Sequence, residues 1–583
     1  MRHAPDTDVE IPESKKPRIE ESKDAATRTS PTSKATSSMK NADLKPINAK
    51  TAPKSKRKLK RKKPDLPEPC SPEDVLWREI KSVLGAYVVE KAIEDGVEFD
   101  SPFSLQQEVE VVVKSLSPSG DAVAIPASDE LSKAPWAIIL PFSLPGEVVR
   151  AKVYRHARMH SVADFIEVVQ PNLEMRDDSK VQCRYFGKCG GCQYQMLPYE
   201  TQLSVKRDVI IKAYQNFSDL PASSVPSVLP TIGSPLQYGY RTKITPHFEA
   251  APKFILKKKQ QDKTDKDEVT EKPDWLKIGF NIVGTRKVMD IEECVIATPV
   301  INQTLPVERV KVVKSVLHAF VRSDGASEVN VDEYFAEALN KHVCITSGKS
   351  TVRERIGGFI FEYRASSFFQ NNNSVLVPLT EYVREAIFPS ASTKPRPSHL
   401  VDTYCGSGLF AITLSPYFET ISGIELSSDS IKSAKHNVSL NNTLREIPAF
   451  NALISSSVPS PIPVSTQKPN IAFQSGTASD IFSSVSSFPR HETVIVIDPP
   501  RKGCDEEFIR QVVQFRPGTL VYVSCNVHTQ ARDIGVLFRM VDEAEEKCDE
   551  AERRGRYQLE SLRGFDLFPQ TAHVESVAVL RLI

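Results

Sequence analysis

The sequence lacks the long apolar segments of a membrane protein, because no apolar run approaches the roughly 20 residues that span a bilayer. Its amino terminus lacks the apolar core of a secretory signal peptide. Its 10 cysteines in 583 residues are too sparse for the disulfide framework of a small secreted domain. These absences predict a soluble intracellular protein, nuclear or cytoplasmic, that binds no membrane, and the sequence indicates no obligate protein partner.

Basic and acidic residues nearly balance over the whole chain, which has a net charge of +1, but the start of the chain is different. Residues 1–70 are rich in Lys, Ser, Thr and Pro and have almost no apolar clusters, so they cannot bury enough surface to offset chain entropy. We expect a disordered basic tail. Within it, Lys15–Arg18 and Lys54–Lys63 are typical of a nuclear-import signal or a nonspecific RNA-binding arm, with a solvated linker as the alternative.

Residues 71–172 show two hydrophobic patterns. Between Pro72 and Val97 apolar residues recur at helical spacing, which predicts a helical lead-in over residues 71–100. Residues 101–172 contain short segments in which apolar and polar residues alternate, the rhythm of a small five-stranded β-barrel.

The segment Leu144–Val149 (Leu-Pro-Gly-Glu-Val-Val) resembles the TRAM domain, an RNA-binding barrel related in shape to the OB fold. The resemblance implies a surface that faces RNA phosphates. We expect this surface to be lined by Arg150, Lys152, Arg155, His156, Arg158 and His160. An ordinary barrel with a solvated basic edge is the alternative.

Residues 173–365 are expected to form a central α+β domain with a group of cysteines. The group comprises Cys183, Cys189, Cys192 and, far downstream, Cys294. Backbone N–H groups freed by the glycines between the second and third cysteines can donate to sulfur, so the thiols can converge on one metal centre. Four thiolates suit an iron–sulfur cluster or a tetrahedral structural zinc, and an absence of metal is the third alternative. The run Tyr238–Lys243 can stack a base and hold a phosphate, or form a structural strand.

From about residue 366 strands and helices alternate, which predicts an α/β domain. His399–Phe410 is a strand, a glycine turn and a helix start, which lets backbone approach a nucleotide-like ligand. Ile421–Glu425 ends the next strand with an acid that is placed to bind a ribose. Because the third glycine of a dinucleotide site is missing, S-adenosylmethionine is the better fit. Asp480 is placed to contact the adenine, or to cap a helix.

Three segments carry reactive groups. Asp498–Gly503 (Asp-Pro-Pro-Arg-Lys-Gly) follows an apolar strand, and Cys525 follows the next strand at the same edge of the sheet. Phe568–Glu575 supplies a second carboxylate. A thiol beside carboxylates is equipped for covalent chemistry followed by proton removal. These motifs resemble the RNA uracil-5-methyltransferase family over about residues 101–583.

The resemblance implies a Rossmann-like, SAM-dependent methyltransferase domain over residues 366–583, preceded by the small TRAM/OB-like β-barrel and the central α+β domain. It implies cofactor contacts, besides that of Asp480, from Gln370, Tyr404, Glu425 and Asp498. Two positions depart from the family pattern: Leu409 stands where Asn is frequent, and Val527 where Pro is usual. The ribosomal-RNA branch holds a 4Fe-4S cluster on a similar set of four cysteines, which favours that cluster over zinc here. The polar insertion Lys257–Lys272 lengthens the gap before the fourth cysteine.

The chemistry explains why the family needs these groups. C5 of uracil is too weakly nucleophilic to take a methyl group, but addition of a thiolate at C6 places charge on C5. Cys525 is therefore the expected nucleophile, Glu575 the base that removes the C5 proton, and Arg501 a cation that lowers the pKa of the thiol. The target base must leave its stack. By resemblance the substrate is tRNA, at uridine 54 of the T loop; a ribosomal-RNA m5U enzyme, or an RNA-folding module with dispensable catalysis, is the alternative.

Overall fold

The computed structural model describes most of the chain beyond the tail, namely residues 67–128, 135–249, 272–319, 331–336, 341–389, 395–445, 469–549 and 553–583. The predicted tail up to residue 66, with Lys15–Arg18 and Lys54–Lys63, and nearly all of the insertion Lys257–Lys272 lie outside the described residues. The chain divides into two units, Met1–Pro64 and Asp65–Ile583, and all described residues belong to the second. In these ranges no helix is long and apolar enough to cross a bilayer.

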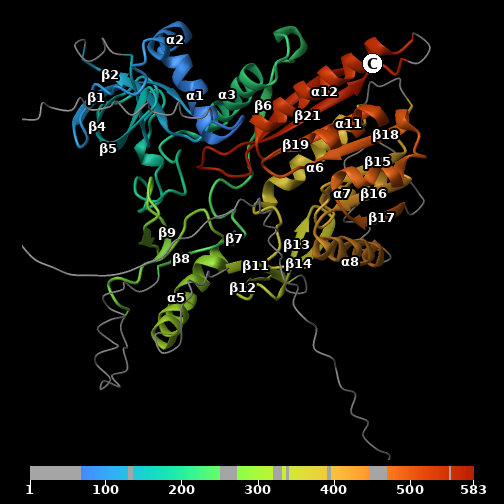
Figure 1. Ribbon diagram of the computed structural model, residues 1–583. Coiled ribbons are helices and arrows are strands. Elements are labelled where there is room, and N and C mark those ends of the chain that lie inside the picture. The colour runs from blue at the N-terminus through green and yellow to red at the C-terminus, as the bar shows by residue number, and fades with distance from the viewer. Residues whose placement is uncertain are drawn as a thin grey trace, which may run out of the picture. The chain divides into compact units, whose positions relative to one another are not determined.

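The helical pattern after the tail corresponds to two helices, α1 (Pro72–Leu84) and α2 (Ala86–Glu94) (Figure 1). The Ser71 side chain caps α1 by accepting a hydrogen bond from the Asp74 N–H, as expected for a Ser before a Pro-led helix. Gly85 ends α1 with a positive φ of 90°, which turns the chain sharply into α2. The apolar faces of both helices pack against the first β domain.

Five strands follow and close into the predicted small barrel, in the order β1-β2-β3-β5-β4. The strands are β1 (Glu108–Leu116), β2 (Ala122–Pro126), β3 (Ala137–Leu140), β4 (Val148–Ala157) and β5 (His160–Gln170). Their alternating apolar residues fill the interior, which explains why a period of two could be read from the sequence. The barrel prediction is confirmed.

The central region combines helices with short antiparallel sheets. Its elements are η1 (Asp178–Lys180), α3 (Tyr199–Phe217), η2 (Ala222–Ser224), β6 (Leu229–Ile232), β7 (Lys243–Ile244), β8 (His247–Phe248), β9 (Ile278–Asn281), β10 (Val288–Asp290), α5 (Pro299–Ala319), β11 (Val331–Ala336), β12 (Lys341–Ile345), β13 (Thr351–Ile356) and β14 (Phe359–Arg364). Within it the strands form a β10-β9-β8 sheet, a β12-β11-β7 sheet and a β13-β14 hairpin.

The carboxyl-terminal half is an α/β sheet with the order β17-β16-β15-β18-β19-β21-β20-β6. Its elements are α6 (Asn373–Ile387), β15 (His399–Thr403), α7 (Leu409–Thr413), η4 (Ser415–Tyr417), β16 (Thr420–Glu425), α8 (Ser428–Arg445), β17 (Asn470–Ser475), η5 (Ala478–Asp480), α10 (Ile481–Val485), η6 (Arg490–Glu492), β18 (Thr493–Ile497), α11 (Glu506–Phe515), β19 (Thr519–Ser524), α12 (Val527–Lys547), β20 (Tyr557–Phe565) and β21 (Glu575–Leu582). Strands β17 to β19 are parallel, and β21 runs antiparallel to β19.

Two apolar clusters cover the two faces of this sheet. One joins the sheet to α3, α10, α11 and α12, and the other joins it to α6, α7, α8 and the β13-β14 hairpin. Strand β6 pairs with β20 at the sheet edge, with Leu229 opposite Arg563. Both α3 and β6 fall within the predicted central domain, so that stretch of chain helps to build the methyltransferase-like sheet.

Candidate active site

The strand register brings the expected nucleophile and base together. Ser524 at the end of β19 lies opposite Ser576 near the start of β21, which places their neighbours Cys525 and Glu575 side by side. Asp498 follows the adjacent parallel strand β18 at the same edge. Glu575 is only 4% exposed, and its Oε1 lies 3.5 Å from Nε2 of His573. The structure therefore assembles the three groups that the sequence placed on separate segments.

The electrostatic surroundings of the Cys525 thiol oppose its ionisation. Burial, followed by the carboxylates of Glu575 and Asp498, raises the pKa of the thiol to about 12. Arg501 lowers this pKa through its charge and a hydrogen bond, as expected, but does not outweigh the other groups. The effect of Arg501 thus has the expected direction, but burial and the two acids outweigh it, so the pKa of the thiol is raised rather than depressed.

Acidic groups crowd the edge where the cofactor is expected. Asp402 accepts a hydrogen bond from the Ala411 N–H at 2.8 Å, while its Oδ1 is buried without a partner, and burial raises the pKa of its carboxyl to about 7. Burial, then Glu575 and Asp402, raise the pKa of Asp498 well above its usual value. A sheet edge with this excess of carboxyl groups favours a cationic ligand, and a sulfonium carries such a charge.

Two predicted cofactor residues lie on adjacent loops of this edge. Tyr404 follows β15 with a positive φ of 61°, and its ring meets Phe508 edge-on. The Glu425 carboxylate at the end of β16 accepts hydrogen bonds from the Gly406 N–H at 3.3 Å and the Ser427 N–H at 2.9 Å. Glu425 therefore reaches the glycine turn, as expected for a shared ligand site. Leu409, which stands where Asn is frequent in the family, is buried in α7.

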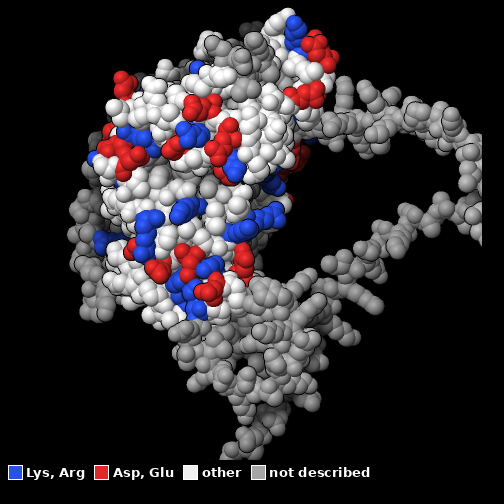
Figure 2. Space-filling model, turned by 90° about the vertical axis from the view of Figure 1, so that its left-hand side faces the viewer, with Lys and Arg blue, Asp and Glu red and all other residues white. Residues whose placement is uncertain are grey.

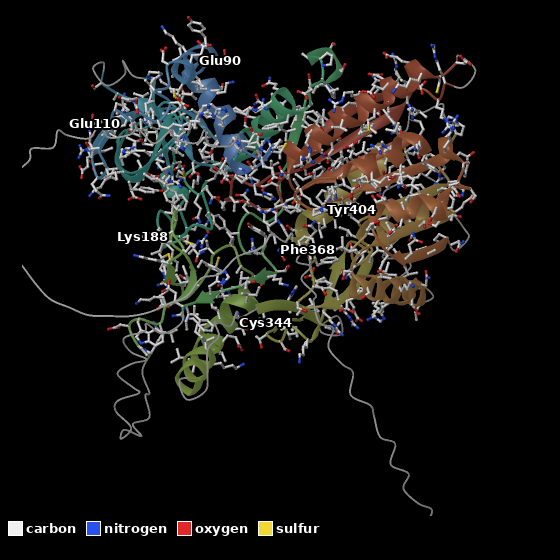
Figure 3. All side chains as sticks on the ribbon, viewed as in Figure 1. Glu90, Glu110, Lys188, Cys344, Phe368 and Tyr404 are labelled. Carbon is white, nitrogen blue, oxygen red and sulfur yellow. The ribbon has the colours of Figure 1, made fainter. Side chains whose placement is uncertain are left out.

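Gln370 is half-buried on a segment that is held from both sides. The Thr242 N–H donates to the Asn371 carbonyl at 3.0 Å, and the Asn372 side chain donates to the Leu567 carbonyl at 3.0 Å, just before the base. Phe368 on the same segment is 78% exposed and is labelled with Tyr404 in Figure 3. This segment thus contacts the loop that leads to Glu575.

Asp480 is engaged locally rather than free. Its Oδ2 accepts hydrogen bonds from the N–H and the hydroxyl of Thr477 at 2.7 and 2.9 Å, which completes a capping box at η5. Asp480 thus completes the cap of η5 from its third position, whereas as the N-cap residue of α10 its side chain makes no capping hydrogen bond, so the N-cap alternative is wrong.

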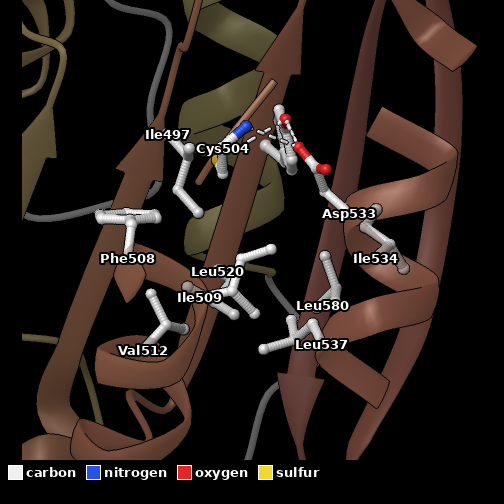
Figure 4. Close-up of a pocket in the computed structure, with 11 residues that line it drawn as sticks. Ile497, Cys504, Phe508, Ile509, Val512, Leu520, Asp533, Ile534, Leu537 and Leu580 are labelled. Atoms are coloured by element: carbon white, nitrogen blue, oxygen red, sulfur yellow. Dashed lines mark hydrogen bonds between the residues drawn. The ribbon is translucent and has the colours of Figure 1, made fainter. Parts of the chain in front are cut away.

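The loop after Asp498 is fixed by residues that the sequence did not single out. Asp533 of α12 accepts hydrogen bonds from the Cys504 N–H and the Tyr522 hydroxyl, both at 2.7 Å. These groups border an apolar cavity of about 20 Å³ beneath the loop (Figure 4). A Cβ on Gly503 would come within 2.5 Å of the Asp533 carboxylate, so only glycine allows this approach. Nothing in the one-dimensional pattern marked Asp533, although it follows the motif around Cys525 by less than three helical turns.

The cysteine loop, residues 183–192, packs against the β9-β10 hairpin. Lys188, labelled in Figure 3, lies in this loop, and its carbonyl accepts a hydrogen bond from the Val283 N–H. Arg184 pairs with Glu292 at 2.7 Å, which ties the loop to the segment that carries Cys294.

The four predicted cysteines are electrostatic neighbours. Burial, followed by Cys294, raises the pKa of Cys192 to about 12, and burial raises that of Cys294 to about 11 with smaller effects of Cys183 and Cys189. The Gln195 amide is buried beside Cys192, and its hydrogen bond to that thiol lowers the thiol pKa, which suits a thiolate acceptor. Among the described residues, however, no three His, Cys, Asp or Glu side chains stand in an arrangement that holds a metal ion. The four cysteines therefore suit a thiolate centre by their chemistry and by being neighbours. Their thiols, however, do not converge into a metal-binding arrangement among the described residues.

The barrel surface differs from the expected basic edge. Arg150 pairs with Glu167 at 2.8 Å, and the barrel register places Glu108 and Asp164 opposite Lys152. The remaining members of the predicted set are partly engaged within the protein: Arg158 over the Trp77 ring, His156 with Ser161 and His160 with the Arg158 carbonyl, whereas Arg155 faces no acid across its strand pair. Figure 2 shows basic and acidic side chains interspersed on the face that it presents. Barrel closure brings acidic strands beside β4, which the sequence order alone did not reveal.

The run Tyr238–Lys243 is mainly structural. Tyr240 is 2% exposed and its hydroxyl donates to the Pro569 carbonyl at 3.0 Å, so its ring cannot stack a base. Lys243 donates to the Ser367 carbonyl, and the Arg241 guanidinium lies over the Phe568 ring. The structural-strand alternative is the one that the fold favours.

Comparison with known proteins agrees with this geometry. A family model described as tRNA (uracil-5-)-methyltransferase matches residues 328–455. A Schizosaccharomyces pombe protein named tRNA (uracil(54)-C(5))-methyltransferase is 41% identical over 536 residues, covering 91% of this chain and 88% of the relative. A Saccharomyces cerevisiae protein of the same name is 32% identical, covering 91% and 84%. The chain belongs to the tRNA (uracil-5-)-methyltransferase family.

The fold is also shared with a solved structure. The Pyrococcus abyssi tRNA (uracil-54, C5)-methyltransferase in complex with S-adenosyl-L-homocysteine has a TM-score of 0.51 and 22% identity, with 81% of this chain and 99% of the other covered. The predicted α/β methyltransferase fold with a preceding small barrel is thus confirmed.

Proposed function

We propose that this chain methylates C5 of uridine 54 in the T loop of tRNA, with S-adenosylmethionine as methyl donor. The observation that carries the proposal is the meeting of Cys525, Glu575 and Asp498 at one sheet edge. The tRNA specificity rests on the names of the two yeast relatives, which this chain matches over most of its length.

S-adenosylmethionine supplies an electrophilic methyl group on a sulfonium when it is bound. The residues that would hold it are Gln370, Tyr404, Glu425, Asp480 and Asp498. Support comes from the reach of Glu425 to the glycine turn and from the excess of carboxyl groups around Asp402. Of these residues, Asp480 would have to exchange a contact with Thr477 or use its other oxygen.

Cys525 then acts as the nucleophile toward the uracil ring. Its thiolate forms a bond to C6, and the electron pair of the C5–C6 double bond moves onto C5 and the neighbouring carbonyl. C5 takes the methyl group as the methyl–sulfur bond breaks with its electron pair on sulfur. Arg501 is the cation that favours the thiolate, against the acids and burial that disfavour it.

Glu575 completes the reaction by taking the proton from C5. The C5–H electron pair restores the C5–C6 double bond, and the bond between C6 and the sulfur of Cys525 breaks with its pair on sulfur. Glu575 is buried beside the thiol, so one carboxylate can reach the ring atom next to the one that the thiol attacks.

Nucleoside analysis of tRNA and ribosomal RNA from cells that lack the protein tests this function. We expect loss of m5U at position 54 of tRNA, restored by the wild type and not by a Cys525→Ala variant. Loss from ribosomal RNA alone would support the ribosomal alternative. Normal tRNA maturation in the Cys525→Ala strain, against a defect in the deletion strain, would identify an RNA-folding role that does not need catalysis.

We further propose that Cys183, Cys189, Cys192 and Cys294 hold a 4Fe-4S cluster with a structural role. The mutual effects of these thiols and the buried Gln195 amide beside Cys192 support it. Anaerobically purified protein should be brown and should contain iron and sulfide. Colourless protein with one equivalent of zinc would establish the zinc alternative, and metal-free protein would exclude both.

Two further proposals concern the amino-terminal part. The closed barrel, as a TRAM-like module, would contact RNA, and exchange of Lys152 and Arg155 for Gln should then weaken tRNA binding in a salt-dependent way. The basic tail would direct nuclear import, so a fluorescent fusion that lacks residues 1–66 should lose nuclear accumulation. Unchanged binding or unchanged localisation would refute the respective proposal.

A further inference from the structure

The segment between β20 and β21, residues 566–574, is called the base loop here because it leads directly into Glu575. Its first residue, Asp566, is fully buried and pairs with the fully buried Lys206 of α3 at 2.5 Å. The Lys206 ammonium also donates to the Phe568 carbonyl at 3.0 Å, and the Tyr199 hydroxyl donates to Asp566 at 2.9 Å. Helix α3 therefore fixes the start of the base loop.

A second contact with α3 fixes the middle of the base loop. The Gln570 N–H donates to the side-chain carbonyl of Gln202 at 3.0 Å, and the Gln202 amide donates back to the side-chain carbonyl of Gln570 at 3.1 Å. Gln570 has a φ of 71°, a backbone conformation that residues with a Cβ rarely adopt unless their surroundings hold them there. The reciprocal pair supplies such a hold, and both side chains are nearly fully buried.

The cysteine loop and the barrel meet the base loop at the same place. The N–H groups of Gln193 and Tyr194, directly after Cys192, both donate to the Gln570 carbonyl at 3.0 Å. The Gln193 side chain accepts a hydrogen bond from the Ala572 N–H at 3.2 Å. Ala572 itself belongs to the apolar cluster of the barrel, and a Cβ on Gly120 in the β1-β2 turn would come within 2.9 Å of it.

We propose that Gln202 and Gln570 are positioning residues that fix Glu575 for removal of the C5 proton. Through the same loop, the barrel and the cysteine loop place the base relative to the thiol. This inference rests on the proposed function. Helix α3, the cysteine loop and the barrel would therefore act in the second half of the reaction, the removal of the C5 proton. The segments around Cys525 are fixed by α12 instead.

The test separates methyl transfer from proton removal with two labels. The Gln202→Met variant keeps a similar side-chain volume but removes both hydrogen bonds to Gln570. Single-turnover reactions use tRNA that carries tritium at C5 of uridine and a methyl donor labelled on the methyl carbon. Methyl incorporation into RNA and adduct reports the first half, and tritium released to water reports the second.

In the wild type we expect the two signals to appear together. In Gln202→Met, methyl incorporation should keep nearly its normal rate while tritium release falls on the order of 10–100-fold, the scale expected for a misplaced catalytic group. Labelled methyl should then accumulate in a protein–RNA adduct on denaturing gels. Gln215→Met, an exposed position on the same helix, is the matched control and should behave as the wild type.

Equal loss of both signals in Gln202→Met, or no loss of either, would overturn the positioning role. If Gln202→Met does not fold, Gln193→Leu carries the same test, since it removes the acceptor of the Ala572 N–H together with the hydrogen bond from the Gln193 amide to the Gly190 carbonyl. A wild type that transfers no methyl group would refute the proposed function itself, whereas normal wild-type turnover with coupled signals in both variants would refute only this inference.

Discussion

The loops beside the two reactive groups are held in opposite ways. The loop of residues 501–504 carries Arg501 and contacts Asn526, the neighbour of Cys525, so it is called the nucleophile loop here. It is fixed by its own neighbourhood, because the Cys504 N–H donates to Asp533, 29 positions away. The base loop is fixed from afar, since Asp566 pairs with Lys206, 360 positions away. The position of the thiol thus depends on contacts within the α/β domain, whereas the position of the base depends on contacts with α3, the cysteine loop and the barrel.

This difference divides the proposed reaction into two separable halves. Disturbing α12 should affect adduct formation, because α12 fixes the loop that carries Arg501. Disturbing α3 should affect adduct release, because α3 fixes the loop that leads to Glu575. Variants of the two loops therefore test whether the division is real.

The largest expected effect is at the nucleophile. Cys525→Ala should form no covalent adduct with RNA that contains 5-fluorouridine, whereas the wild type should be trapped, because fluorine at C5 cannot leave as a proton. A denaturing gel shift with labelled RNA measures this. A stable adduct in Cys525→Ala would mean that another nucleophile attacks C6.

The base variant should stop the reaction one step later. Glu575→Gln keeps the shape but cannot accept the proton, so the methylated adduct should form and its release should slow about 10²–10⁴-fold. A pulse of labelled methyl donor followed by a chase measures release. Normal turnover would mean that another group removes the proton, and His573 would be the next residue to test.

Lys206→Met should reveal how strongly the base loop depends on α3. The change leaves the buried Asp566 without its cationic partner and should lower the free energy of unfolding by about 3–5 kcal/mol. Arg510→Met removes an exposed pair with Glu506 and should cost at most about 1 kcal/mol. Urea denaturation measures both, and equal costs would contradict the account of the base loop.

Asp533→Asn should weaken the contacts that hold the nucleophile loop, with a smaller effect than that of Lys206→Met. It removes the negative partner of Arg532 and weakens the contacts with Cys504 and Tyr522, so adduct formation should slow about tenfold while release is unchanged. Asp542→Asn, which removes an exposed pair with Arg556, is the control. Slower release with normal formation would reverse the assignment of the two loops.

The last prediction concerns pH, and its smallest part is the effect of Arg501. Because the pKa of Cys525 is raised to about 12, the thiol is protonated near neutrality and its thiolate fraction should rise about tenfold per pH unit below that value. Alkylation of Cys525 by iodoacetamide between pH 7 and 9 should follow this slope, with a lower rate in Arg501→Gln. A plateau below pH 9 would show that the thiol ionises more readily than this arrangement allows.

The sequence by itself determined the reactive groups and the local elements that carry them. Strand β1 lies where the alternation predicted it, and Cys525 and Asp498 stand at adjacent strand ends, because short-range periodicity and turn residues encode such placement. The family likewise followed from contiguous motifs.

Only the tertiary structure decided what holds these groups and what surrounds them. No periodicity in α3 marks Lys206 or Gln202, because their partners lie in a loop hundreds of positions away. The burial of Tyr240 and the pairing of Arg150 with Glu167 likewise arise only when distant strands meet. Sequence patterns report the faces of single elements, whereas the position of the base and the pKa of the thiol depend on contacts between elements that are far apart in the chain.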